Sequence, residues 1–166
     1  MEVHSTYFVL LTSDFYNVHS EENRHILKQI ASLGHTIGLH FDEVAYSQMI
    51  DENIDSDHHA NMLIGLIQTE ATMMSNVLDL QVDTVSMHRP SQFCLQNDLQ
   101  IPGMINSYGQ EFFKGFKYLS DSRHYWREDV LPYIREEKFD RLHILTHAFW
   151  YHQENVSLQD ALTDYL

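Results

Sequence analysis

The stretch GHTIGLHFD, residues 34–42, decides how the rest of the chain is interpreted. Its apolar residues Ile37, Leu39 and Phe41 alternate with small or polar ones, and the small and polar set ends at His40. Because successive side chains of a strand point to opposite faces, this alternation predicts a strand with an apolar back. The other face ends in an imidazole, which raises the question of a metal site.

Composition limits the classes of function. The chain has 166 residues, 43% of them hydrophobic, which favours a single folded domain over residues 1–166. Its net charge of −14 excludes nucleic acid and anionic membrane surfaces as favourable partners. No apolar run has the length of a membrane span, and the first residues lack the features of a signal peptide, so we expect a cytoplasmic protein.

Predicted strands alternate with predicted helices along the chain. This order is typical of an α/β fold with a parallel sheet, and we expect a partial or distorted (β/α) barrel or an open sheet. Ser20 is the expected N-cap of the first helix, whose predicted apolar residues are Ile26, Leu27, Ile30 and Leu33. The strands are expected over residues 5–11, 34–42, 84–89, 116–122 and 141–147, and the helices over 20–33, 55–77, 106–114, 129–137 and from Asn155 or Ser157 onward.

Three of the predicted strands end in a histidine: His40, His88 and His147. If all three face inward, they converge at the rim where α/β proteins place their active sites. Imidazole is a good zinc ligand and a good general acid, and the single Cys94 leaves only His, Asp and Glu as ligands. Five other histidines lie in polar surroundings and are expected to be solvated: His19, His25, His58, His59 and His152.

Further candidates lie near the strand ends. Asp42 follows His40 and is a candidate metal ligand, and Asp121 is a candidate substrate contact. Arg89 is placed to orient a carboxylate, and Trp126 and Trp150 offer aromatic faces of the kind that stack on sugars. Each also has a structural interpretation, as a capping carboxylate, an anchoring arginine or a core aromatic residue.

At this point the chain resembles the polysaccharide deacetylases, which are metal-dependent carbohydrate esterases. GHTIGLHFD is similar to their Gly-His-Glu-Ile-Gly-x-His segment, SMHRPS to their Arg-Pro segment, and LHILTH to their late Leu-x-His segment. The resemblance extends over about residues 5–151 and is closest to deacetylase-like proteins of bacterial surface-polysaccharide clusters. It implies a distorted (β/α) barrel that removes an acetyl group from a sugar with a divalent metal, usually zinc. It also implies that His40 binds the metal, that Arg89 orients the base and that His147 is the catalytic acid.

The chain departs from the family pattern in two places. Where the family has its second metal histidine, this chain has Val44, so His88 or Asp42 is expected to replace that ligand, with His88 preferred. The Asp-rich first strand, which supplies the family's base, has no counterpart here. We interpret the chain as a shortened member with weak or lost activity; alternatively, a second chain completes the site or Asp14 takes over the role. An absent strand also predicts an unpaired apolar edge and a homo-oligomer formed through it.

The leading hypothesis is therefore a metal-dependent hydrolase that removes an acetyl group from an N- or O-acetylated sugar. The main alternative is a non-catalytic carbohydrate-binding or scaffold protein that uses Trp126 and Trp150 as stacking surfaces. A third is a metal-dependent hydrolase of small amides.

Overall fold

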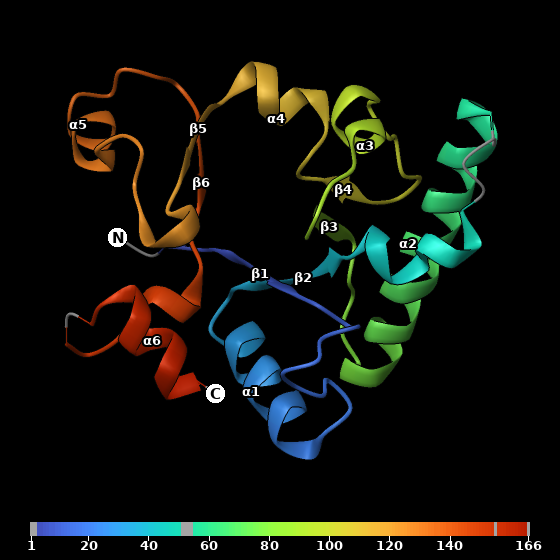
Figure 1. Ribbon diagram of the computed structural model, residues 1–166, viewed down its shortest axis with the longest axis horizontal. Coiled ribbons are helices and arrows are strands. Elements are labelled where there is room, and N and C mark those ends of the chain that lie inside the picture. Colours follow the sequence, from blue (N-terminus) through green and yellow to red (C-terminus); the bar gives the residue numbers. More distant parts are fainter. Residues whose placement is uncertain (1–2, 51–54, 155, 166) are drawn as a thin grey trace. The chain divides into compact units, whose positions relative to one another are not determined.

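The computed structural model describes residues 3–50, 55–154 and 156–165 and divides into two compact units (Figure 1). The first unit is Met1–Gly109 and the second is Gln110–Leu166. Within the described residues, no helix combines the length and the apolar character that a membrane span needs. A single domain over the whole chain stays a prediction, and each unit is described by itself below.

The first unit is built on a four-stranded parallel sheet. The strand order is β1 (Thr6–Val9), β2 (Thr36–Phe41), β3 (Thr84–Met87) and β4 (Ile105–Asn106), so β2 and β3 are central. The predicted α/β class with parallel pairing is confirmed. β4 was not expected: Ile105 and Asn106 pair with Thr84 and Val85, so the helix expected from Asn106 cannot begin there.

Helices connect these strands, and their ends follow the local sequence. α1 (Glu21–Ser32) begins after Ser20, whose side chain accepts a hydrogen bond from the Asn23 backbone N–H, as expected for an N-cap. Gly34 follows it with a φ of 89°, a left-handed conformation that favours glycine after a helix. The long α2 (Ser56–Leu78) is capped by Asp55. Two short helices follow the strand ends: the 3₁₀ helix η1 (Glu43–Met49) after β2, and α3 (Gln92–Gln96), which was not predicted, after β3.

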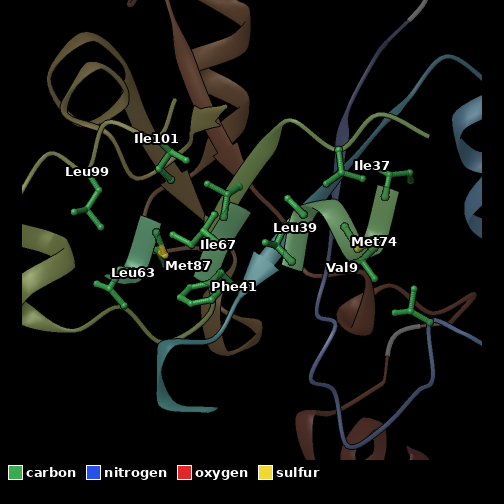
Figure 2. Packing of buried hydrophobic residues seen from close by; sticks show 14 of the residues in the cluster. Val9, Ile37, Leu39, Phe41, Leu63, Ile67, Met74, Met87, Leu99 and Ile101 are labelled. Carbon is green, nitrogen blue, oxygen red and sulfur yellow. The ribbon is translucent and has the colours of Figure 1, made fainter. Parts of the chain in front are cut away.

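The hydrophobic core lies between the sheet and α2 (Figure 2). Ile37, Leu39 and Phe41 are at most 3% exposed, which confirms the apolar back of β2. They pack in one cluster with buried residues of α2, among them Leu63, Ile67 and Met74. The expected face of α1 is partly wrong: Ile26 and Leu33 are 45% and 69% exposed, while Leu27 and Ile30 pack against the core.

Gly38 in β2 is required by a close approach from the neighbouring strand. A Cβ atom added there would lie 2.7 Å from Cε1 of Phe8, because the Phe8 ring in β1 crosses the strand at this point. A side chain at position 38 would therefore displace Phe8. Because Gly38 has no side chain, the Phe8 ring can lie over β2 next to His40. The centroids of the Phe8 and His40 rings are 6.5 Å apart.

The second unit contains a smaller parallel sheet of two strands, β5 (Lys117–Ser120) and β6 (Leu142–Leu145). The final helix begins after Ser157, whose Oγ accepts a hydrogen bond from the Asp160 backbone N–H; Asn155, the other predicted cap, lies outside the described residues. The remaining elements are α4 (Gln110–Gly115), η2 (Ser122–His124), α5 (Val130–Arg135), η3 (Ala148–Trp150) and α6 (Leu158–Tyr165).

One ionisable group lies inside the core. Glu70 of α2 is 1% exposed, and its Oε1 accepts a hydrogen bond from the hydroxyl of Tyr46, whose ring stacks on Phe41. Burial raises the pKa of Glu70, and the negative charge of Asp42 raises it further, against the opposing effect of the Tyr46 hydrogen bond. Ionisation of Glu70 at this buried position therefore destabilises the folded state.

Replacing this carboxyl should stabilise the fold at alkaline pH. Because the folded pKa of Glu70 lies above its ordinary value of 4.5, its contribution to stability is complete below that value and is lost as pH rises through the folded pKa. Glu70→Gln keeps an acceptor for Tyr46 but cannot ionise. We expect it to raise the unfolding temperature by ~3 °C at pH 8, and the gain to shrink toward pH 4, measured by circular dichroism. Glu111→Gln, at an exposed position, is the control, and an equal shift at both pH values would contradict this role.

Candidate functional site

His40 and His88 meet at the carboxyl ends of the two central strands. His40 lies in β2 opposite Ser86, and the backbone N–H of His88 continues the pairing by donating to the Phe41 carbonyl at 2.8 Å. The Nε2 atom of His40 and the Nδ1 atom of His88 are 3.1 Å apart, with the rings at 78°. His40 is half-buried and His88 is exposed, so the pair lies at the surface end of the sheet. The predicted meeting of these two strand-end histidines is confirmed.

Asp42 and Arg89 form an ion pair next to the histidines. Nε of Arg89 donates to Oδ1 of Asp42 at 3.2 Å, and Nη2 donates to Oδ2, which is a bidentate arrangement. Asp42 is 5% exposed and also caps η1 by accepting from the Val44 backbone N–H. Burial raises the pKa of Asp42, but the hydrogen bonds from Arg89 and Val44 and the Arg89 charge outweigh it, so the net pKa shift is downward. Asp42 is therefore ionised at neutral pH.

The two imidazole nitrogens are within hydrogen-bond distance of each other, and their spacing is also near that of two ligands of one divalent ion. Zinc binds imidazole nitrogen at about 2.0–2.1 Å, so two such ligands of a tetrahedral ion lie ~3.3 Å apart. The 3.1 Å between the His40 and His88 nitrogens is close to this value. The described residues do not contain a ready-made group of three His, Cys, Asp or Glu side chains around such an ion. Asp42, the third predicted ligand, is directed to Arg89, and Val44 is 47% exposed with no ligating atom.

A second set of contacts joins the same two segments, and sequence reasoning missed it. Oε2 of the buried Glu43 accepts from the Ser91 backbone N–H at 3.2 Å and from the Cys94 thiol at 3.3 Å. His59 was expected to be solvated, but its ring stacks on Phe93 at 4.1 Å and its Nε2 lies 3.6 Å from Oε1 of Glu43. Burial raises the pKa of the Cys94 thiol to about 12, and the Glu43 charge adds to the effect. The thiol is therefore a structural group and a poor nucleophile.

The second unit holds His147 against a buried carboxylate. Asp121 follows β5 and is 2% exposed; its Oδ1 lies 2.6 Å from Nδ1 of His147. The same carboxylate accepts from the His147 backbone N–H at 3.0 Å and from the Tyr151 hydroxyl at 3.2 Å. Because an ionised carboxylate only accepts, the Nδ1–H of His147 donates to it, and Nε2 is left to exchange a proton. The expected substrate contact, Asp121, is thus directed toward His147.

The two predicted tryptophans also lie in the second unit. Trp150 stacks on His124 with centroids 5.4 Å apart and lies 6.4 Å from the His147 ring. Its Nε1 is buried and has no hydrogen-bond partner within the described residues. Trp126 is half-buried. Trp150 therefore lies beside the His147–Asp121 pair, which is where a residue that stacks on a ligand of this pair would lie.

The structure thus assembles the predicted residues into two groups. His40, His88, Asp42 and Arg89 lie together in the first unit. His147 lies in the second unit with Asp121 and Trp150, and its convergence with the other two histidines stays a prediction.

No family model, curated protein or solved structure matches the chain.

The Asp42–Arg89 pair predicts a stability change with a defined pH window. Because the folded pKa of Asp42 is lowered, its stabilising effect is present above the ordinary value of 3.8 and is lost as pH falls through the folded pKa. Asp42→Asn keeps the cap of η1 but removes the charge. We expect a loss of roughly 1–2 kcal/mol in the free energy of unfolding at pH 7, measured by urea denaturation. The difference between variant and wild type should disappear below the folded pKa of Asp42. Asp140→Asn, at an exposed site, is the control, and a deficit that persists unchanged at pH 2 would argue against the pair.

The histidine pair predicts binding of a divalent ion. We expect the wild-type protein to bind zinc, cobalt or nickel, and His40→Ala and His88→Ala each to weaken binding by about tenfold or more. Binding should also weaken as the solution is made more acidic, because protons compete with the metal for the imidazole nitrogens. The measurement is metal analysis with cobalt absorption spectra, and His19→Ala, which removes an exposed histidine, is the control. Equal metal content in wild type and both pair variants would show that the site is absent.

Proposed function

We propose that the protein is a metal-dependent hydrolase that removes an acetyl group from an N- or O-acetylated sugar, on a distorted (β/α) barrel of the deacetylase type. The observation that carries this proposal is the His40–His88 pair, 3.1 Å apart, beside an Asp–Arg ion pair at the carboxyl ends of adjacent parallel strands. The family resemblance of the motifs that contain these residues supports the choice of reaction.

In this proposal the first unit supplies the metal ligands and a carboxylate. His40 and His88 would hold the ion, which when bound polarises the acetyl carbonyl and a water molecule. Asp42 is the ionised carboxylate next to this pair, and it would accept a proton from water only if one of its oxygens left Arg89. Its lowered pKa makes it a weak base at neutral pH, since general-base catalysis is most efficient when the pKa is near the working pH.

His147 is proposed as the acid that protonates the leaving group. Its Nδ1 is bound to Asp121, which fixes the tautomer, orients the ring and stabilises the protonated imidazole. The ring is half-exposed, so Nε2 is accessible from solvent, and Trp150 beside it offers an aromatic face to a sugar ring.

The alternative is a carbohydrate-binding protein without catalysis. It is favoured by Trp150, whose indole N–H is buried without a partner in the described part of the chain. A donor in that position is suited to a ligand hydroxyl. We also propose that copies associate through β1, which pairs only with β2 among the described strands.

Acetate release separates the two functions. We expect the zinc- or cobalt-loaded protein to release acetate from acetylated amino-sugar oligosaccharides, and a chelator to abolish the release. His147→Ala should lower the rate by ~100-fold or more, because it removes the general acid. His152→Ala, at an exposed histidine nearby in sequence, should retain the wild-type rate.

Two other outcomes are informative. Metal binding without acetate release from any acetylated sugar would refute the catalytic proposal. Sugar binding that survives both chelation and His147→Ala would support the non-catalytic alternative.

A further inference from the structure

A hollow of about 460 Å³ lies in the second unit at the amino ends of β5 and β6. The His147–Asp121 pair follows the carboxyl ends of the same two strands, so the hollow is a separate feature. Its volume is within the range of small-molecule sites.

Several aromatic side chains of the hollow are exposed. Phe113, Phe139 and Tyr118 are 48%, 46% and 38% exposed, and they line one hollow together with Phe116. Single exposed apolar residues are common on a protein surface, but a group gathered in one concave site is typical of ligand binding. Aromatic faces of this kind pack against the apolar face of a ring.

The hollow is lined by more basic than acidic side chains, although two of the basic ones already pair with carboxylates outside the lining. Three of the chain's 10 basic residues line it against one carboxylate, although the whole chain carries −14. Lys117 is already paired with Glu128 at 2.6 Å. Lys114 donates only to the neutral Gln110 side chain among its described contacts. Arg141 lies over the Phe116 ring and is 3.8 Å from Glu111 in an exposed, weak pair. Lys114 and Arg141 therefore have charge available for an anion.

Asp140 is the single carboxylate in the lining of the hollow. It adds a third requirement for a ligand, after the aromatic and the basic side chains. Asp140 would repel a simple anion, but a carboxylate readily accepts hydrogen bonds from hydroxyl groups. A ligand that satisfies all three features has a ring face, one negative group and free hydroxyls.

We propose that this hollow binds a sugar ring that carries a carboxylate or phosphate group. The ring packs on the aromatic side chains, the anion binds Lys114 and Arg141, and hydroxyls donate to Asp140. The choice of a sugar rests on the proposed function, whereas the need for an anionic group rests on the hollow itself. An acidic polysaccharide, repelled by most of this surface, would be held here through one of its charged units.

The test is a titration of the full chain with three probes, followed by nuclear magnetic resonance: glucuronic acid, glucose 6-phosphate and neutral glucose. For ligands of this size we expect a Kd of ~1 mM for at least one charged probe and binding of glucose at least about tenfold weaker. The charged probe that binds more tightly identifies the anionic group. Added salt should weaken its binding.

The variants locate the site. Arg141→Gln and Lys114→Gln should each weaken binding of the charged probe by about fivefold or more. Phe139→Ser should weaken all three probes. Lys138→Gln is the matched control, because Lys138 adjoins Phe139 but pairs with Glu136 and does not line the hollow; it should stay within about twofold of wild type.

Several results would overturn the proposal: equal affinity for glucose and the charged probes, no effect of either cation variant, or no binding of any probe. These failures are distinct from failure of the proposed reaction. His147→Ala and a chelator should leave glucuronic acid binding unchanged, so loss of acetate release with this binding intact would be a failure of the reaction alone.

Discussion

The parallel register between β2 and β3 is the constraint on which the candidate metal site depends. With His40 opposite Ser86, and with the His88 N–H bound to the Phe41 carbonyl, the segments that leave the two strands run side by side. A slip of one residue would turn every side chain of one strand to the other face and would direct a histidine into the core. Phe41 and Met87, both at most 2% exposed, oppose that slip, because moving either out of the core would expose a large apolar side chain.

Two adjacent carboxylates hold these segments together in different ways. Asp42 is ionised and binds the Arg89 side chain, whereas Glu43 points into the interior and accepts from the Ser91 backbone and the Cys94 thiol. Both bonds run from the end of β2 to the residues that follow β3. The positions of His40 and His88 are therefore fixed by the sheet on one side and by this double connection on the other. A metal site on such a support is more rigid than one on free loops.

Much of the fold was predictable because local chemistry and tertiary structure agree. The alternation in β2, the cap at Ser20, and the histidines at two strand ends all follow from single segments of sequence. The features that were missed depend on contacts between distant segments. His59 lies among polar residues, so nothing local indicated that its ring stacks on Phe93.

The same limit applies to the predicted roles at the site. The pairing of Arg89 with Asp42 depends on the strand register, and Asp121 is distinguished from other loop aspartates only by its contacts with His147 and Tyr151. β4 is two residues long, which is too short to produce a periodic pattern.

The Cys94–Glu43 contact gives the first unit an internal reporter. The chain has one cysteine, it is 4% exposed, and its thiol is bonded to a carboxylate that connects the two strand ends. While that contact holds, a thiol with a pKa of about 12 is almost entirely protonated and reacts slowly with alkylating reagents. When the segment opens, the thiol returns to ordinary solution reactivity. The rate at which this single residue is labelled therefore reports on how readily the support beneath His40 and His88 opens, and no cysteine has to be introduced.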